Sequence, residues 1–366
     1  MKLQAQRETF LKPIQAVIGV VERRQTMPIL ANVLITAGKD GLAVTASDLE
    51  VELVAKAQVD VDTAGEVTVP GRKILDLVRA LPDGAKVTMA TERDRLVIRS
   101  GKSRFTLSTL PAREFPVIDD IQTQRQFTVP QKALRELIDR TAFAMAHQDV
   151  RYYLNGLLFE MAGSRLRTVA TDGHRLALCD ADGAADYGQQ HQVIVPRKGV
   201  LELQRLLEEA DTPAAVEVGS NHIRVDLPSL KFTSKLIDGR FPDYERVVPK
   251  QGDKELIADR GLLRDALSRA SILSNEKYRG IRLTLSGSTL KIVAHNPEQE
   301  EAEEELEVKY SGGDLEIGFN VTYLLDALNA VQGDSIRIGL ADANSSCLIA
   351  APDRPQARYV VMPMRL

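Results

Sequence analysis

The sequence predicts an α+β protein of three similar domains, each with two helices packed on antiparallel sheets. Three kinds of element recur in one order at a spacing of about 124 residues, which favours an internal repeat over chance similarity within one domain. They are a first helix (8–20, 131–145, 260–273), a pair of strand-like runs (28–48, 152–172, 278–296) and a second helix (69–82, 195–209, 319–333).

Each element has its own signature. In the second copy of the first helix, Leu134, Leu137, Ile138 and Thr141 fall on one face at helical spacing. The paired runs alternate apolar and polar residues around a short turn containing Gly, which is typical of a hairpin. These runs end at three residues that are 124 apart, Asp48, Asp172 and Asn296.

Prolines and closing strands complete each unit. Pro70 and Pro196 precede two of the second helices, where a residue without an N–H is tolerated. Further strands follow, and 104–116 aligns with 231–242. The predicted domains are therefore 1–121, 122–246 and 247–366.

Composition narrows the class of protein. The 366 residues carry a net charge of −4, which argues against a DNA-binding surface spread over the whole molecule but not against one basic face. No apolar run has the length of a membrane helix, and residues 1–13 lack the apolar core of a signal peptide. We therefore expect a cytoplasmic protein with no membrane partner.

Cofactor and metal chemistry are not expected. Cys179 and Cys347 belong to no Cys/His cluster, so we expect both to be reduced, structural side chains and expect neither a metal site nor a cofactor. The Gly101–Ser103 segment lacks the earlier glycine of a phosphate loop, because Leu96 stands at that position.

Catalytic motifs are not evident either. Asp172 and His174 end a strand that recurs without any histidine, and the sequence contains no GxSxG, HExxH or GxGxxG motif. Two alternatives stay open at this point. One is a hydrolase or nucleotidyltransferase with dispersed catalytic residues, and the other is a scaffold that binds peptides but never DNA.

Several motifs resemble one family. FPDY followed by an Arg-Val pair, HQDVRYYLNG, TVATDGHRLA, ILSNEK, NPEQEEAEE and the terminal VVMPMRL are similar to the bacterial sliding clamp, the β subunit of DNA polymerase III. The resemblance covers nearly the whole chain. It implies the DNA clamp fold, a head-to-tail homodimer of six domains in a ring around double-stranded DNA, and a processivity factor in DNA replication without catalytic activity. It also implies partners that bind through short motifs: the polymerase III alpha subunit, the clamp loader, translesion and repair polymerases, mismatch repair proteins and ligase.

Domain size is compatible with that ring. A domain of about 122 residues has a radius of gyration of roughly 14 Å, equivalent to a sphere roughly 35 Å across. Six such spheres in a hexagon leave a hole of about 35 Å, whereas three leave about 5 Å. A duplex is roughly 20 Å wide. One chain is therefore too small to encircle DNA, but two are not.

The predicted helices are more basic than the rest of the chain. Counted over residues 7–19, 72–81, 131–144, 197–209, 260–271 and 320–332, they hold 14 Lys/Arg against 9 Asp/Glu, which leaves −9 for the remainder. Solvated helix faces are often Lys/Arg-rich in any protein, so this bias alone is weak. Candidate hole-lining residues are Arg72, Lys73, Arg135, Arg197, Lys198, Arg205, Arg264 and Arg269. The resemblance adds Arg24, Gln148, Tyr152 and Tyr153 on loops, where the paired tyrosines would stack on exposed bases or simply pack at the start of a strand.

A head-to-tail ring needs two unlike surfaces that fit each other. One is an acidic stretch in domain three, and the other is a basic, partly apolar strand in domain one. On its own, the acidic stretch is usually a solvated edge. The resemblance places the interface at Lys102, Arg104, Phe105, Leu107, Ile272, Leu273, Glu298, Glu300, Glu301, Glu303 and Glu304.

The resemblance also implies a partner-peptide pocket between domains two and three. Its leucines, valines, proline and methionine would form an adaptable apolar slot, although such residues can also be ordinary interdomain packing. The pocket residues are Leu154, Thr171, Gly173, His174, Arg175, Leu176, Pro242, Arg246, Val247, Asn320, Tyr323, Ser346, Val360 and Met362. No motif supports the wall around residues 343–344.

Overall fold

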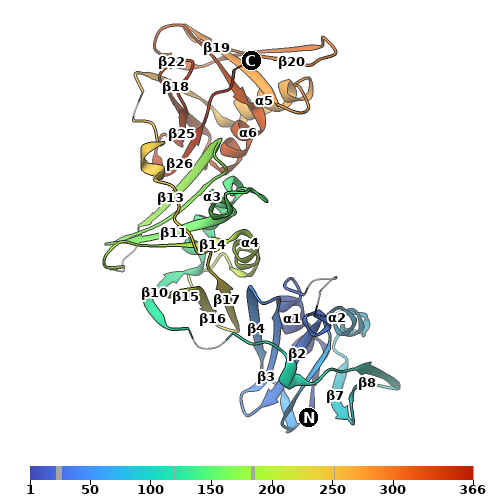
Figure 1. The fold of residues 1–366 in the computed structure, drawn as a ribbon. Coiled ribbons are helices and arrows are strands. Elements are labelled where there is room, and N and C mark those ends of the chain that lie inside the picture. Colours follow the sequence, from blue (N-terminus) through green and yellow to red (C-terminus); the bar gives the residue numbers. More distant parts are fainter. Residues whose placement is uncertain (22–26, 119–120, 183–185, 251, 366) are drawn as a thin grey trace. The chain divides into compact units, whose positions relative to one another are not determined.

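The computed structural model describes residues 1–21, 27–118, 121–182, 186–250 and 252–365. Its elements follow one order three times (Figure 1). The first copy is β1 (Lys2–Gln6), α1 (Arg7–Val17), β2 (Asn32–Gly38), β3 (Gly41–Ser47), β4 (Val51–Ala57), β5 (Asp60–Thr63), β6 (Gly65–Pro70), α2 (Gly71–Ala80), β7 (Lys86–Glu92), β8 (Arg95–Ser100) and β9 (Ser103–Ser108).

The third copy keeps this order, and the second does so except that its described residues contain no strand at the place of β5. The second is β10 (Thr123–Pro130), α3 (Gln131–Thr141), β11 (Gly156–Ala162), β12 (Arg165–Thr171), β13 (Arg175–Asp182), β14 (His191–Pro196), α4 (Arg197–Leu206), β15 (Pro213–Gly219), β16 (His222–Leu227) and β17 (Leu230–Lys235). The third is β18 (Lys254–Asp259), α5 (Arg260–Ile272), β19 (Gly280–Ser286), β20 (Thr289–His295), β21 (Glu301–Glu307), β22 (Lys309–Ser311), β23 (Leu315–Asn320), α6 (Val321–Ala330), β24 (Ser335–Leu340), β25 (Cys347–Ala351) and β26 (Arg354–Val361).

The predicted helices and hairpins are confirmed. Each helix turns an apolar face to a sheet; on α5, for example, Leu263, Ala266 and Leu267 are buried. The α5 helix begins where the Asp259 carboxylate accepts a hydrogen bond from the Leu262 N–H at 2.8 Å, which satisfies a donor of the first turn. The strands before the first helices, β1, β10 and β18, were not individually predicted.

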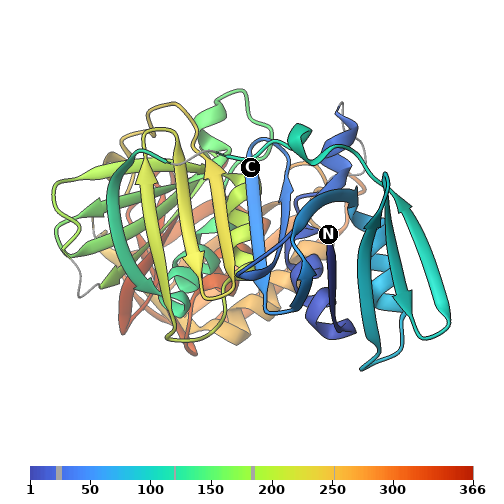
Figure 2. The ribbon, with the colours of Figure 1, turned by 90° about the horizontal axis from the view of Figure 1, so that it is seen from below.

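Two sheets continue across domain boundaries. An eight-stranded sheet has the order β10-β15-β16-β17-β4-β3-β2-β6, and a nine-stranded sheet has the order β14-β11-β12-β13-β26-β25-β24-β18-β22. We call the antiparallel β17–β4 pairing the first joint and the β13–β26 pairing the second joint. In Figure 2 the yellow strands of the first joint run beside the blue strands of the same sheet.

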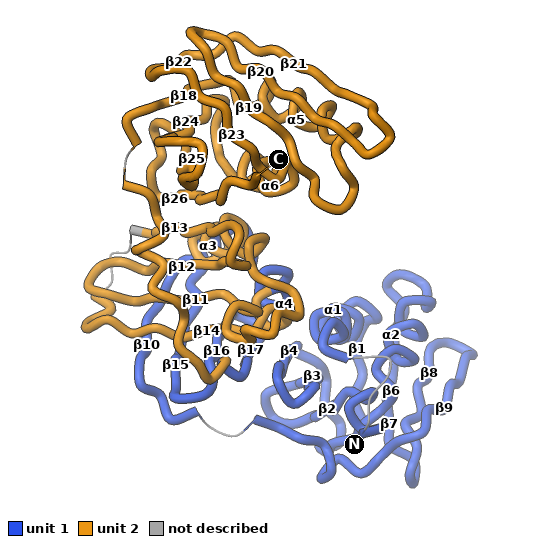
Figure 3. The backbone as a smooth tube through the Cα atoms, turned by 45° about the horizontal axis from the view of Figure 1, so that its top comes forward, with its two compact units in different colours: residues 1–132, 201–236 blue, residues 133–200, 237–366 orange. Residues whose placement is uncertain are grey.

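The chain separates into two compact units (Figure 3). One contains residues 1–132 and 201–236, and the other contains residues 133–200 and 237–366. The middle repeat is divided between them, because β10 and β15–β17 extend the sheet of the first repeat whereas β11–β14 extend the sheet of the third. Each unit therefore contains one complete joint.

The two joints have the same register. Leu96, Ile223 and Cys347 hold equal places on β8, β16 and β25, and they pair with Leu107, Ser234 and Val361. Two residues earlier on β9, β17 and β26 lie Phe105, Phe232 and Tyr359. Phe232 pairs with Leu53 in the first joint, and Tyr359 pairs with Ala177 in the second. Both aromatic side chains are almost completely buried.

Two strands equivalent to the joint strands are edges in the described part of the chain. Strand β9 ends the five-stranded sheet β5-β1-β7-β8-β9, and β21 ends the four-stranded sheet β21-β20-β19-β23. In sequence order β9 corresponds to β17 and β26, and β21 corresponds to β4 and β13. Each therefore presents an unpaired row of backbone hydrogen-bonding groups.

Candidate functional site

The most constrained part of the second joint is the turn before β13. The Asp172 carboxylate accepts hydrogen bonds from the N–H groups of His174 (2.9 Å) and Arg175 (3.0 Å). The Thr171 hydroxyl accepts one from the Gly173 N–H at 3.1 Å. Gly173 has φ +88°, a conformation that favours glycine, and a Cβ there would come within 2.9 Å of the Arg151 guanidinium. Because residue 173 is a glycine, no side chain projects from the turn at this position.

Arg175 holds the turn against domain three. Its guanidinium pairs with Asp172 at 3.1 Å and with Asp326, and it lies 4.6 Å from the ring centroid of Tyr323. The His174 ring also stacks on the Tyr323 ring, with centroids 6.3 Å apart. Beyond the turn, the Met362 N–H donates to the His174 carbonyl at 3.0 Å. The structure thus brings these predicted pocket residues into one cluster.

The segment after Phe241 forms the next wall. It contains the short 3₁₀ turn Tyr244–Arg246, whose Tyr244 side chain is buried. The Tyr244 hydroxyl donates to the Glu160 carboxylate at 3.0 Å and accepts from Arg167 at 3.1 Å, and burial raises the Tyr244 pKa to about 12. Arg167 in turn binds Asp180 on β13 through two nitrogens. This polar network ties the wall to the centre of the second joint.

The predicted apolar slot is only partly open. Leu154, Leu176 and Val360 are 2–3% exposed, and Leu176 and Val360 pack in one apolar cluster with Tyr244 and Phe241. Val247 and Met362 are 42% and 38% exposed. The three buried side chains therefore form the base of the pocket, and Val247 and Met362 are available for contact with a ligand.

A groove of about 380 Å³ opens beside these exposed residues. Arg246, Val247, Ser346 and Met362 of the predicted pocket line it, and so do Leu340 and Leu348. The uncertain wall lies elsewhere: residues 343 and 344 are exposed in a turn held by Asp342, and neither lines the groove.

Asn320 and Tyr323 belong to the start of α6. The Asn320 side-chain oxygen accepts hydrogen bonds from the N–H groups of Thr322 and Tyr323, and its amide donates to the Tyr278 carbonyl at 3.2 Å. Tyr278 itself is 57% exposed. Asn320 therefore has a structural role as a helix cap at the edge of the site.

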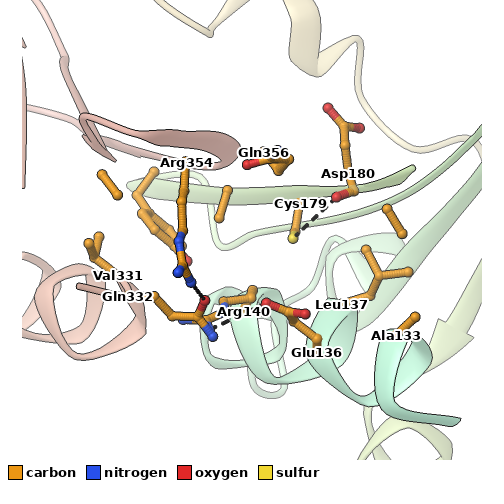
Figure 4. A pocket seen from close by; sticks show the side chains of 14 residues that line it. Ala133, Glu136, Leu137, Arg140, Cys179, Asp180, Val331, Gln332, Arg354 and Gln356 are labelled. Carbon is orange, nitrogen blue, oxygen red and sulfur yellow. Dashed lines mark hydrogen bonds and ion pairs between the residues drawn. The ribbon is translucent and has the colours of Figure 1, made fainter. Parts of the chain in front are cut away.

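The helix side of the second joint has a separate cavity of about 280 Å³ (Figure 4). Leu137 and Arg140 reach it from α3, Cys179 from β13 and Gln332 from the end of α6. Arg140 donates to the carbonyl of Ala330, the last residue of α6, where the helix dipole favours a cation. Both cysteines are free and buried, which agrees with the expected structural role, and burial raises their thiol pKa values to about 12.

The predicted helical DNA-contact residues lie on α2, α3, α4 and α5, but not all their charges are equally available. Arg72 and Lys73 are exposed on α2, although Arg72 donates to the Val21 carbonyl at 3.0 Å. Arg205 donates to Glu202 and to the Ala16 carbonyl. Arg197 donates to the Met145 carbonyl at 3.2 Å. The remaining positions are Lys198 on α4, Arg135 on α3 paired with Asp139, Arg264 on α5 beside Asp265, and Arg269 on α5 paired with Glu304.

The loop residues form a second group. Gln148 is exposed with φ +57°, and Tyr152 is 56% exposed. Tyr152 and Tyr153 meet edge to face, with ring centroids 5.7 Å apart. Tyr153 is half-buried and packs against the apolar cluster at the base of the pocket, so strand-start packing accounts for it. Arg24 lies outside the described residues.

The predicted interface residues occupy the two free edges. On β9, Arg104 is exposed while Phe105 and Leu107 are half-buried. On β21, Glu301 and Glu303 are exposed and Glu304 is half-buried against Arg269, which holds the Glu304 pKa below its ordinary value. Ile272 is 75% exposed. The rest of the set is exposed or half-buried beside these edges: Lys102, Leu273, Glu298 and Glu300.

Sequence reasoning missed two parts of the site. Glu160, Arg167 and Tyr244 form a buried polar network although each stands in a different segment. The groove also contains Lys254 and Arg337, which are far apart in the sequence and belong to no motif. A charge on an inward-facing strand position was the only available signal for Glu160 and Arg167.

Comparisons with known proteins cover the full length. Three family models match: the N-terminal (residues 1–119), central (128–243) and C-terminal (245–365) domains of the DNA polymerase III beta subunit. Proteins named Beta sliding clamp from Pseudomonas aeruginosa and Escherichia coli are 55% and 54% identical over 100% of both chains.

Solved structures agree. A Pseudomonas aeruginosa DNA polymerase III subunit beta matches with a TM-score of 0.98 at 54% identity, covering 100% of each chain. A Bartonella birtlesii sliding clamp bound to griselimycin matches with a TM-score of 0.97 at 40% identity, again covering 100% of each chain. In the described part of this chain, no helix is long and apolar enough to cross a membrane.

Proposed function

Since this chain belongs to the DNA polymerase III beta subunit family, we propose that it is a DNA sliding clamp, in which two copies close head to tail around duplex DNA and hold polymerases there. The observation that carries the proposal is the repeated joint. Two joints exist within the chain, and β9 and β21 are the equivalent strands left unpaired. A third joint between two copies would use both edges, and two such contacts would close a six-domain ring.

The repeat also gives the register of that third joint. Ser47, Thr171 and His295 are equivalent, and they pair with Glu52, Leu176 and Glu301. Leu53 and Ala177 therefore correspond to Ala302. Because these two residues pair with Phe232 and Tyr359, we infer that Phe105 of one copy pairs with Ala302 of the other. Arg104 then lies opposite Glu303, an opposite-charge pair that supports the arrangement.

Burial supports the same register. Phe232 and Tyr359 are 0% and 1% exposed, whereas Phe105 is only half-buried in the single chain. In the second joint Tyr359 packs against Phe143, with ring centroids 5.8 Å apart. Phe143 lies twelve residues after the start of α3, and Ile272 lies twelve after the start of α5. Ile272 would therefore cover Phe105 of the other copy, which accounts for its exposure.

A double cysteine variant tests both the ring and its register. Thr106→Cys with Glu301→Cys joins residues that face each other in the inferred pairing, and Thr106→Cys with Glu303→Cys is the matched pair shifted by two residues. We expect rapid oxidation to a covalent dimer only for the first pair. After loading, that dimer should stay on nicked circular DNA and leave when the DNA is linearised. Retention on linear DNA would refute the topological model.

The helices are proposed to line the hole. Exposed cations such as Arg72 and Lys73 would attract phosphates without reading bases, which gives salt-dependent but sequence-independent contact. We propose the remaining helix and loop residues named above, Arg24 included, as weaker contributors. Arg205 and Arg269 already bind carboxylates, so their contribution requires exchange of those pairs.

The cluster around Gly173, Arg175, Val247 and Met362 is proposed as the docking pocket for short motifs of polymerases. Two observations support this proposal. The turn carries no side chain at Gly173, and the exposed side chains of Val247 and Met362 lie beside buried apolar residues. We further propose the finer set of partners: the alpha subunit, the clamp loader, translesion and repair polymerases, mismatch repair proteins and ligase. Pull-down experiments with wild-type protein and with Met362→Asp test these partners. A partner that binds through the pocket should be captured by the wild-type protein but not by the variant.

We further propose that the domains extend over 1–121, 122–246 and 247–366, that the protein works in the cytoplasm, and that it has no catalytic activity of its own. Nuclease and ATPase assays on pure protein test the last statement, and measurable turnover that copurifies through several columns would contradict it.

A further inference from the structure

The groove beside Met362 continues well past the predicted pocket. From Met362 it crosses β25 at Leu348 and β24 at Gly339, and it reaches β18 at Lys254. Leu348, Gly339 and Glu255 share one face of the sheet, because Leu348 and Glu255 both pair with Gly339, and Lys254 lines the groove from the first position of β18. The pocket and the groove therefore form one continuous surface about three strands wide.

The groove is basic. Arg246, Lys250, Lys254 and Arg337 line it, and Glu255 is the single carboxylate among its described lining residues. Arg246 is paired with Asp243 at 2.7 Å, and Lys254 with Asp253 at 3.1 Å. The contact between Arg337 and Glu255 is long, at 3.9 Å. Lys254 also interacts electrostatically with Asp342, so each of these three cations has a carboxylate neighbour, and an added anion would bind at Lys250 or by exchange with those carboxylates.

Gly339 keeps the groove open. Its φ is not in the left-handed region, and a Cβ there would have only ordinary contacts, the nearest being the Leu348 carbonyl at 3.8 Å. The equivalent fifth residues of β7 and β15 are Ala90 and Glu217, so this strand position accepts side chains elsewhere in the chain. The backbone conformation at position 339 therefore does not require glycine, and the effect of glycine there is to leave the groove unobstructed.

We propose that this groove binds the acidic segment that adjoins the docking motif of a partner protein, as an extended strand-like peptide with carboxylates facing Lys254 and Arg337. The proposal rests on the proposed docking pocket, with which the groove is continuous. Charge complementarity selects a peptide with Asp or Glu, and the half-buried Leu348 with the exposed Val247 and Met362 supplies apolar contact.

Disulfide tethering measures the preference of the groove itself. Ser345 lines it, and Ser345→Cys adds an accessible thiol, whereas the two native cysteines are buried with pKa values raised to about 12. The dimeric full-length variant is equilibrated, under mild reductant, with cysteine peptides carrying three Asp, three Asn or three Lys. We expect the Asp peptide to be captured about fivefold more than the Asn peptide at low salt, with the difference falling as salt rises.

In the Ser345→Cys variant, Gly339→Val should remove the preference for the Asp peptide, because a side chain would then project into the groove. Ala90→Val at the equivalent place in domain one should leave that preference unchanged. Valine suits a strand, so neither change should unfold the protein. Equal capture of the three peptides, or a preference that survives Gly339→Val, would overturn the proposal.

A second measurement separates this inference from the proposed function. Binding of the polymerase III alpha subunit to Gly339→Val should be about three- to tenfold weaker than to wild type, and Ala90→Val should match wild type. Unchanged binding would mean that no partner segment uses the groove. If the alpha subunit failed to bind even the wild-type protein, the docking proposal itself would fail, and this is a distinct result.

Discussion

The two joints share one backbone design but differ at their margins. Both turns before the joint strand are built alike: Asp48 accepts from the N–H groups of Glu50 and Val51 as Asp172 does from those of His174 and Arg175. Yet Leu49, with φ +76°, stands where the second joint has Gly173, and the first joint has Lys235 where the second has Met362. The same backbone arrangement therefore carries a leucine and a lysine at the edge of the first joint, but a glycine and a methionine at the edge of the second.

The segments that follow each joint are also held differently. In the first joint, the buried Glu52 carboxylate accepts a hydrogen bond from the Ile118 N–H at 2.8 Å. In the second, Tyr244 at the corresponding place uses its hydroxyl to reach Glu160 and Arg167. A repeated sheet can thus be kept intact while side chains at its edge make one joint a docking site and leave the other structural.

The largest expected effect tests whether the seam is a third copy of the joint. Phe232→Ala should cost about 3–5 kcal/mol of folding free energy, because it empties a fully buried position. Phe105→Ala should leave the unfolding of a dilute monomer nearly unchanged but weaken dimerisation about 30-fold, since about 2 kcal/mol is expected for a central interface aromatic. Chemical denaturation and sedimentation measure the two quantities. Equal dimerisation of Phe105→Ala and wild type would show that β9 is not a joint strand.

The next effect concerns the residues that differ at the edges of the two joints. Gly173→Leu with Met362→Lys copies the first joint into the second, and it should weaken binding of the polymerase III alpha subunit by at least about tenfold. Leu49 already occupies the same turn at positive φ, so the fold accommodates a leucine there, at the cost of backbone strain and a shift of the Arg151 guanidinium. The reciprocal variant, Leu49→Gly with Lys235→Met, is the control and should bind the alpha subunit as wild type does. Loss of binding in the reciprocal variant would reveal a role for the first joint in docking.

A smaller effect is expected from the buried network. Tyr244→Phe retains the ring but removes the hydroxyl that donates to Glu160, and leaving a buried carboxylate without this donor should cost about 1–3 kcal/mol. Ile118→Val at the corresponding place in the first joint should cost less than about 1.5 kcal/mol, since it removes one methylene from a half-buried side chain. Urea unfolding of both variants tests the contrast, which disappears if the network is not stabilising.

The sequence predicted the repeated elements well because their signals are local. Helical spacing on α3 and alternation around the hairpin glycines depend on residues close together in the chain. The joints are different: their register depends on backbone groups of β17 and β4, or of β13 and β26, which belong to different repeats. No residue pattern marks such an edge as paired, so the division of the middle repeat between two sheets was not predictable.

The same distinction holds for the site. The turn with Gly173 and Arg175 was found because its residues are consecutive and form a motif. The groove was missed because Lys254, Arg337 and Leu348 meet only after β18, β24 and β25 pair. Charge counting named Arg205 as a DNA contact, but the count could not show that its guanidinium already binds Glu202 and a helix end.

The smallest effect is the pH dependence that Glu160 contributes in the second joint. Burial raises the pKa of the Glu160 carboxyl, but hydrogen bonds from Gln192, Gln190 and Tyr244 outweigh burial, so its pKa lies below the ordinary value of 4.5. A group whose pKa is lower in the folded state stabilises the protein above its unfolded pKa, and that contribution is lost as the pH falls through the folded value. Glu160→Gln should therefore be less stable than wild type near pH 7, and the gap should narrow below about pH 4.5. Thermal unfolding across pH 3–7 measures it, and a gap of constant size would mean that the charge of Glu160 does not hold the docking wall in place.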